Sequence, residues 1–206
     1  MKPIIAIDLI GTLITSKSWD ESHPDWFNYF AEVLQDPSIK EYAKLEDWWP
    51  KVHEVMEKYL PDDTKEARTV IARTMFSIMF FKRISSEDVV KEFADYLRKQ
   101  TKYDVALVTS FPDILINLLL EKMGCLDIFS IVLASKSNKE SDKKLVFEEF
   151  ITKFGKPVYY IGNGNKNIIS CKEVGIKTVS VNWLSESKCK GNYDVNSVKE
   201  LENLIK

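Results

Sequence analysis

Residues 4–15 read IIAIDLIGTLIT, and the interpretation of the whole chain starts from this stretch. Its opening run, Ile4 to Ile7, is apolar without alternation and ends in a carboxylate, Asp8. Such a run predicts a strand that is buried on both faces, as in a parallel sheet. A charge at the end of a buried strand is unfavourable unless it has a partner or a function. Asp8 is therefore the first candidate for a catalytic residue.

Apolar, β-branched runs of the same kind recur along the second half of the chain. They lie at residues 104–109, 130–134, 158–162 and 177–181. Helical patterns separate or follow them, near residues 112–123, 142–154, 165–174 and 196–205. For the helix near 112–123 we expect Ser110 as the N-cap, with Asp113 completing a capping box. Strands that alternate with helices predict an α/β fold with a doubly wound parallel sheet.

The stretch from residue 15 to residue 102 breaks this alternation. It has no strand-like run and predicts helices near residues 24–35, 38–59, 63–82 and 86–101, with prolines at or near their boundaries. Its aromatic residues recur at helical spacing, which is typical of the core of a helical bundle. We expect a core domain of residues 1–14 plus 103–206, and an all-helical cap of residues 15–102 inserted after the first strand.

The composition excludes several classes of protein. The chain has 206 residues, of which 45% are hydrophobic and 29% are charged, as in ordinary globular domains. A formal net charge of −2 provides no basic field for nucleic acid or for an anionic membrane. No leader and no membrane-length apolar run is present, so we expect a cytoplasmic protein. The three cysteines are widely spaced and fit neither a disulfide framework nor a zinc site.

Polar residues gather where the predicted strands end, and in open α/β sheets ligands bind at these carboxyl ends. The candidates there are Asp8, Gly11, Thr12, Thr109, Ser110 and the lysines that follow residue 135. A carboxylate, a hydroxyl group and an ammonium group that converge can attack an electrophile and hold its negative charge. The sequence therefore predicts covalent catalysis on an anionic substrate.

The ordered set of motifs resembles the haloacid dehalogenase superfamily over nearly the whole chain. The first motif of that family, Asp-x-Asp-Gly-Thr, here reads Asp8-Leu9-Ile10-Gly11-Thr12. The second motif, a serine or threonine that ends a strand, is matched by Thr109. The third motif, a lysine ahead of a helix, is best matched by Lys143, with Lys139 and Lys144 as alternatives. The fourth motif reads YIGNGNKN, with Asn163 and Asn167 at its two acid positions.

The resemblance implies a role for each matching residue. Asp8 would be the nucleophile, and Thr109 and Lys143 would complete the catalytic set. Gly11, Thr12 and Ser110 would bind the substrate phosphate. In phosphatases of the family a Mg²⁺ lies between the first and fourth motifs, so its ligands here would be Asp8, the backbone carbonyl of Ile10 and Asn163.

The departures from the family pattern concern the acids. Ile10 replaces the general acid–base, and loss of such a group typically costs about 10²–10⁴-fold in rate. Asn163 and Asn167 retain carbonyl oxygens but carry no charge, whereas Mg²⁺ gains most from anionic oxygen ligands. We therefore expect Mg²⁺ to bind weakly at best.

The resemblance implies a hydrolase with an Asp nucleophile that acts on a small phosphorylated or otherwise anionic metabolite, with impaired or atypical activity. One alternative is a catalytically inactive binding protein that keeps the fold. Another is a metal-independent hydrolase that attacks carbon, as haloacid dehalogenases do. Candidates for binding an anionic tail of the substrate are Arg68, Arg73 and Arg83. The sequence identifies neither the substrate nor the oligomeric state.

Overall fold

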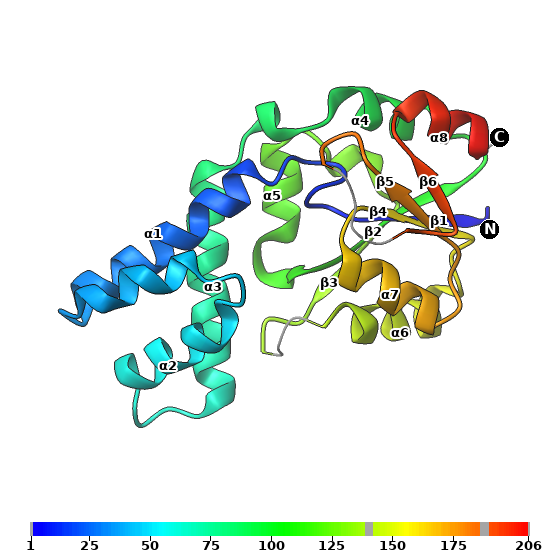
Figure 1. The fold of residues 1–206 in the computed structure, drawn as a ribbon. Helices are drawn as coiled ribbons and strands as arrows, with labels where there is room; N and C mark the ends of the chain where they lie inside the picture. The colour runs from blue at the N-terminus through cyan, green and yellow to red at the C-terminus, as the bar shows by residue number, and fades with distance from the viewer. Residues whose placement is uncertain (1, 139–141, 186–189, 206) are drawn as a thin grey trace.

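The computed structural model describes residues 2–138, 142–185 and 190–205 (Figure 1). The strands are β1 (Ile4–Ile7), β2 (Asp104–Pro112), β3 (Ile131–Ser135), β4 (Tyr159–Gly162), β5 (Thr178–Val181) and β6 (Tyr193–Val195). The α-helices are α1 (Lys17–Val33), α2 (Trp49–Tyr59), α3 (Lys65–Arg83), α4 (Lys91–Arg98), α5 (Ile116–Lys122), α6 (Lys143–Phe154), α7 (Asn165–Glu173) and α8 (Val198–Leu204). Short 3₁₀ helices are η1 (Pro37–Lys44), η2 (Ser86–Asp88), η3 (Asp113–Leu115) and η4 (Leu126–Ile128).

The strands form one six-stranded sheet in the order β3-β2-β1-β4-β5-β6, and every pairing is parallel. β1 lies in the middle of the sheet and pairs with β2 through Ile7 and Leu107, and with β4 through Ile7 and Ile161. The carboxyl ends of these three strands therefore meet beside Asp8. This confirms the predicted α/β class with a doubly wound parallel sheet.

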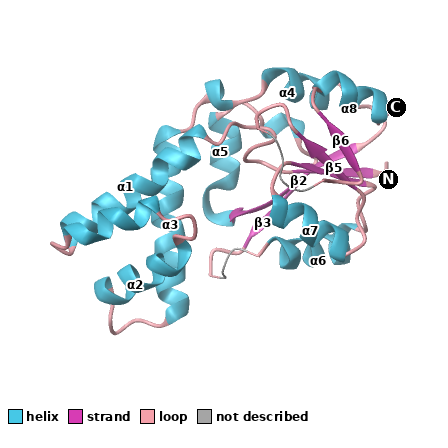
Figure 2. Cartoon of the chain, viewed as in Figure 1, coloured by secondary structure: helices cyan, strands magenta, loops and turns pink. Residues whose placement is uncertain are grey.

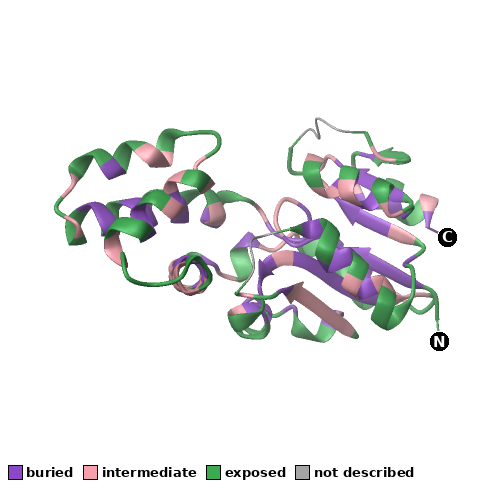
Figure 3. Ribbon diagram, turned by 90° about the horizontal axis from the view of Figure 1, so that it is seen from below, coloured by how far each residue is buried: buried purple, intermediate pink, exposed green. Residues whose placement is uncertain are grey.

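Helices cover both faces of the sheet, which explains why the strands are apolar without alternation. Ile5 and Ile7 face one hydrophobic cluster, which continues into α4, α5, α8 and the helices left of the sheet in Figure 1. Ile4 and Ala6 face a second cluster, formed with α6 and α7. Figure 3 shows the central strands as buried ribbons between more exposed helices.

The helices α1, α2 and α3, together with η1, form a separate layer beside the sheet, and we call them the cap helices (Figure 2). Their shared core is aromatic: the Trp26 and Phe30 rings lie 4.3 Å apart, and Phe30 lies 5.1 Å from Tyr59. The fourth helix of this stretch, α4, instead packs against α8 and η4 beside the sheet.

The predicted helix boundaries between residues 15 and 102 were partly wrong. The first helix begins at Lys17, well before the predicted 24, and contains Pro24 in its interior. The predicted helix at 38–59 is a 3₁₀ helix followed by α2, and the one at 86–101 is η2 followed by α4. Tertiary contacts explain the early start of α1, because the Ser18 hydroxyl donates to Asp88 Oδ1 at 3.0 Å and Trp19 packs on Phe76.

The predicted cap of the helix near 112–123 was also wrong. β2 continues through Ser110 to Pro112, and η3 then begins with Pro112 as its N-cap and no side-chain cap bond. The Asp113 carboxylate instead accepts the backbone N–H of Ser137 at 3.1 Å. Gly124, Gly155 and Gly175 adopt positive φ after their helices, a conformation that glycine adopts readily at the end of a helix. β6 was not predicted, because a short and largely exposed strand carries little periodic signal.

No helix within the described part of the chain is long and apolar enough to cross a membrane.

Candidate active site

A cleft of about 880 Å³ opens at the carboxyl ends of β1 and β2, between the sheet and the cap helices. Its core side includes Asp8, Ile10, Thr109, Ser110, Phe111, Pro112, Asp142, Lys143, Leu145, Lys166, Asn167, Ile169 and Ser170. Its cap side is formed by Trp19, Asp47, Trp48, Trp49, Arg73 and Phe76. The volume lies within the usual range for small-molecule sites, so the cleft can enclose a metabolite.

Asp8 is the buried charge at the base of this cleft. The residue is 5% exposed, and its Oδ1 accepts the Lys143 ammonium at 2.8 Å and the backbone N–H of Leu9 at 3.0 Å. Its Oδ2 accepts the Asn167 side chain at 2.7 Å. Three donors therefore stabilise the carboxylate as an anion, while Oδ2, with a single donor, keeps a lone pair for attack.

The orientation of the Asn167 amide follows from this contact. An ionised carboxylate oxygen only accepts hydrogen bonds, so the amide must present Nδ2 rather than Oδ1 to Asp8. A carboxylate at position 167 would instead repel Asp8 at this distance. Asn167 is thus a neutral donor that holds the anion in place.

The Lys143 ammonium is held beneath Asp8 by further contacts. Its Nζ donates to the carbonyl of Val108 at 2.6 Å and lies 5.7 and 5.4 Å from the ring centres of Phe147 and Tyr160. The side chain is 4% exposed. A buried ammonium is tolerated only with such a partner, and Asp8 supplies the counter-charge.

Three lysines were candidates for the third-motif position beside Asp8, and the structure distinguishes between two of them. Lys144, the next residue, points to the surface and pairs with Glu173 at 3.1 Å. The Asp142 side chain caps α6 by accepting the backbone N–H of Lys144 at 2.8 Å, which fixes the first turn and directs Lys143 toward the sheet. Lys139 lies outside the described residues.

The groups around the ion pair stay neutral. Burial raises the pKa of the Tyr160 phenol well above its usual value, and the nearby Asp8 charge adds to the shift. Burial likewise raises the pKa of the Cys171 thiol. Asp8 and Lys143 are therefore the charged groups in the floor of the cleft, and their charges cancel.

Thr109 and Ser110 line the cleft beside Asp8, whereas Gly11 and Thr12 do not. Thr109 is 3% exposed, and its hydroxyl oxygen accepts the backbone N–H of Phe111 at 3.1 Å, so the hydroxyl hydrogen can donate to a ligand. Gly11 forms the turn after β1 with φ +74°, which a side chain would strain. Thr12 is fully buried, and its carbonyl accepts the indole N–H of Trp183 at 3.1 Å.

Ile10 and Asn163 occupy positions where the family carries acids. The Ile10 side chain lines the cleft and packs on the main hydrophobic cluster, so it places an apolar surface next to Asp8. The Asn163 amide donates to the carbonyls of Val181 and Ser185 at 2.6 and 2.9 Å. Asn163 thus ties the loop after β4 to the segment after β5 and does not line the cleft.

These residues fit a Mg²⁺ site poorly. The carboxylate at the strand ends is already paired with Lys143, and Asn167 turns its nitrogen rather than its oxygen toward it. Over residues 2–138, 142–185 and 190–205, no group of three or more His, Cys, Asp or Glu side chains is placed to hold a metal. A divalent cation would therefore bring two positive charges to a site whose own charges already balance.

Arg73 joins the cap to the core, a role that the sequence did not indicate. This α3 residue is 4% exposed and donates to the carbonyls of Ser110 and Lys136 at 2.9 and 2.7 Å and to the Ser135 hydroxyl at 3.4 Å. Burial lowers the pKa of its guanidinium to about 10, so it remains charged at neutral pH.

The other two arginine candidates lie away from the cleft. Arg68 pairs with Glu57 at 3.4 Å, within the cap. Arg83 pairs with Glu21 and Asp25 of α1 at 3.1 and 2.5 Å. Their ion pairs therefore connect cap helices to one another.

Comparison with known proteins identifies the class to which this fold and site belong. A family model for haloacid dehalogenase-like hydrolases matches residues 3–175, so the chain belongs to that family. No curated protein matches the chain significantly.

Solved structures share the fold. A predicted phosphatase from Clostridium acetobutylicum has a TM-score of 0.68 at 19% identity, over 100% of this chain and 98% of its own. A phosphatase of the same superfamily from Thermococcus onnurineus has a TM-score of 0.64 at 20% identity, over 100% and 98%. A β-phosphoglucomutase from Clostridium difficile has a TM-score of 0.62 at 17% identity, over 100% and 96%. At these identities the similarity shows the fold alone.

Proposed function

We propose that this family member is a phosphatase-type hydrolase in which Asp8 is the nucleophile and the substrate is a small phosphate monoester. The observation that carries the proposal is the Asp8 carboxylate at the end of β1, buried, held by three donors and facing the cleft. Thr109 and Lys143 complete the catalytic set. The cap helices, within the predicted inserted domain at 15–102, enclose the substrate and exclude bulk water.

In the first step, Asp8 Oδ2 attacks phosphorus, and the bond from phosphorus to the leaving-group oxygen breaks with its electron pair. The Lys143 ammonium and the Thr109 hydroxyl stabilise the negative charge of the transferring group. In the second step, water attacks phosphorus and the bond to Asp8 breaks with its electron pair on the carboxylate. One hydrogen of the water stays on the phosphate product, and the other passes as a proton to the solvent. Charge is balanced in both steps without a bound metal ion.

Ile10 sets the limits of this chemistry. A side chain without a proton cannot protonate a departing alkoxide, nor can it take a proton from the attacking water. Substrates whose leaving groups are stable as anions are therefore favoured in the first step. In the second step the Ile10 side chain cannot act as a base that activates the water. We therefore expect the acyl-phosphate on Asp8 to accumulate.

The test is hydrolysis of p-nitrophenyl phosphate by the wild-type protein and by Asp8→Asn, each with Mg²⁺ or with a chelator. We expect wild-type activity that persists with the chelator, disappears in Asp8→Asn, and begins with a burst of p-nitrophenolate. Mass spectrometry should find one added phosphoryl group on the peptide that contains Asp8.

Three outcomes contradict the proposal. Turnover that survives in Asp8→Asn would place the chemistry elsewhere. Halide release from a 2-haloacid without phosphatase activity would favour the dehalogenase alternative. Absence of turnover of phosphate esters and haloacids, with no phosphorylated Asp8, would favour the binding-protein alternative.

A further inference from the structure

Aromatic residues make up four of the six residues named above on the cap side of the cleft. Trp19, Trp48, Trp49 and Phe76 come from the cap helices and their loops, and Phe111 faces them from the end of β2. The rings support one another: Trp19 packs edge-on against Phe76 at 4.6 Å, and Trp48 stacks on Phe76 at 6.1 Å with an interplanar angle of 20°. The wall is therefore preorganised rather than formed by isolated side chains.

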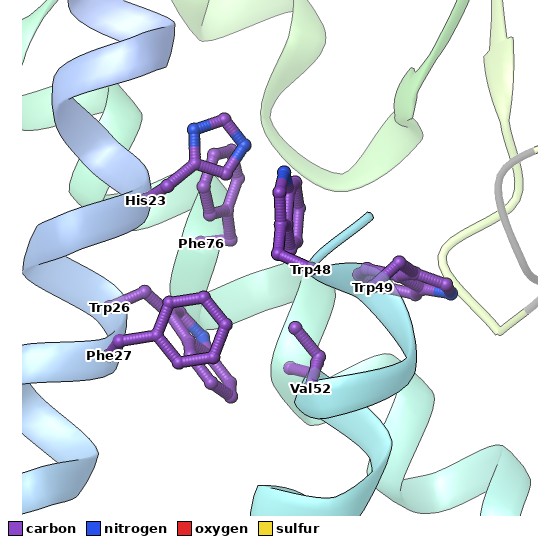
Figure 4. A pocket seen from close by; sticks show the side chains of 8 residues that line it. His23, Trp26, Phe27, Trp48, Trp49, Val52 and Phe76 are labelled. Atoms are coloured by element: carbon purple, nitrogen blue, oxygen red, sulfur yellow. The ribbon is translucent and has the colours of Figure 1, made fainter. Parts of the chain in front are cut away.

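Figure 4 shows three of these side chains, Trp48, Trp49 and Phe76, where they also line a small pocket inside the cap. Trp48 stands beside His23 and Phe76, whereas Trp49 extends away from the core of the cap helices. Trp49 has ring contacts with Trp48 at 5.7 Å and with His53 at 5.3 Å. Trp19, Trp48 and Trp49 are all partly exposed, so faces or edges of their rings are available to a ligand.

The same side of the cleft offers few polar partners to a leaving group. Among the described residues that line it, the charged ones on the cap side are Asp47 and Arg73. The Arg73 guanidinium is already bonded to the carbonyls of Ser110 and Lys136. A sugar or another polyol placed against the ring faces would find few partners there for its hydroxyl groups, and each polar group buried without a partner costs about 1–3 kcal/mol.

The core side of the cleft supplies a second, independent constraint on the leaving group of the substrate. Ile10 cannot protonate the departing oxygen, so the leaving group must be a stable anion without help. A phenol has a pKa of about 10, well below that of an aliphatic alcohol. Phenolate is therefore by far the better unassisted leaving group.

From these two constraints we infer that the substrate is a phosphate monoester of a small phenol-type alcohol, with its aromatic ring against Trp19, Trp48 and Trp49 and its phosphorus facing Asp8. This inference rests on the proposed phosphatase function. The cleft of about 880 Å³ has room for an aromatic ring in addition to the phosphate.

Binding and turnover test the inference separately. Phenylphosphonate and butylphosphonate cannot be hydrolysed, so calorimetry with the wild-type protein compares their affinities without chemistry. A ring–ring contact adds about 0.5–1.5 kcal/mol, so we expect phenylphosphonate to bind about 2- to 13-fold more tightly. The kcat/KM for phenyl phosphate should also exceed that for butyl phosphate.

Variants connect this preference to the wall. Trp49→Leu should abolish the preference for phenylphosphonate, and Trp49→Phe, which keeps a ring, should retain most of it. Tyr29→Leu is the matched control, because Tyr29 is a 40% exposed aromatic residue of the cap that does not line the cleft. Circular dichroism melting confirms that each variant is folded.

The outcomes distinguish the preference for an aromatic substrate from the proposed phosphatase activity. Equal binding of the two phosphonates, or a preference that Trp49→Leu leaves intact, would overturn the inference even if phosphate esters are hydrolysed. Selective binding of phenylphosphonate with no turnover of any ester would support the aromatic site and count against the proposed phosphatase function.

Discussion

The buried ion pair between Asp8 and Lys143 leads to a stability prediction that needs no substrate. The two groups lie 2.8 Å apart, with side chains 7% and 4% exposed. Lys143→Met removes the ammonium and leaves a buried carboxylate without its counter-charge. Asp8→Asn leaves the ammonium in the same position, and the double variant removes both charges.

The magnitude follows from the burial of the pair. Breaking a buried ion pair by removing one partner costs about 3–5 kcal/mol, a large part of a typical stability of about 5–15 kcal/mol. For a chain of this length that corresponds to a fall in Tm of about 6–20 °C. Because the double variant leaves no unpaired charge, we expect a coupling energy of about 1–3 kcal/mol rather than additive losses.

Urea unfolding of the four proteins, followed by circular dichroism, measures this cycle. Lys144→Met is the matched control, because the adjacent lysine pairs with Glu173 at the surface and should leave the unfolding midpoint nearly unchanged. Strictly additive losses would refute the reasoning, as would a Lys143→Met variant no less stable than Lys144→Met. Recovery of Lys143→Met on addition of Mg²⁺ would show that a cation can replace the ammonium.

Three further predictions concern single residues. Burial lowers the pKa of His23 below 6.5, so the unfolded chain takes up a proton at a higher pH than the folded chain does. The free energy of unfolding should therefore fall as the pH drops from about 7.5 to about 5.5. Urea unfolding should show a smaller fall in the variant His23→Leu. Arg73→Lys keeps the positive charge but loses the planar guanidinium that donates to two core carbonyls. We expect the free energy of unfolding to fall by about 1–3 kcal/mol and limited proteolysis of the cap to become faster. Arg83→Lys is the control. Ile10→Asp supplies a proton donor beside Asp8. Steady-state kinetics should show kcat/KM for butyl phosphate rising by about 10²-fold with a well-placed carboxyl group. The kcat/KM for phenyl phosphate should change little. An equal effect on both esters would contradict the assignment of Ile10 as the missing acid.

The strands β1 to β5 were predictable from the sequence, because each is a short apolar run that can be buried only between two layers of helices. The predicted run at residues 104–109 and the observed β2, Asp104–Pro112, differ at one end alone. There Ser110 looked like a helix cap, but parallel pairing with β3 extends the strand to Pro112. Pairing between distant segments thus overrode a local capping signal.

The cap was less predictable, since its helices are defined by contacts with each other. Pro24 suggested the start of a helix, yet α1 begins at Lys17 because the first turn packs on α3 and bonds Asp88. The position of Arg73 illustrates the same limit. Its acceptors lie 37 and 63 residues further along the chain, and no periodic pattern encodes such a contact.

The sequence was sufficient to place Asp8 at the carboxyl end of a buried strand, because the apolar run before it predicts such a strand. The resemblance to the family's first motif was sufficient to show that Ile10 stands where an acid is expected. The sequence could not show that Lys143 lies against Asp8 while Lys144 faces the solvent. It also could not show that Asn167 donates to Asp8, or that Trp19, Trp48 and Trp49 line the same side of the cleft. Those arrangements depend on how α6, α7 and the cap helices are oriented against the sheet, and that orientation is set by packing among residues far apart in the chain.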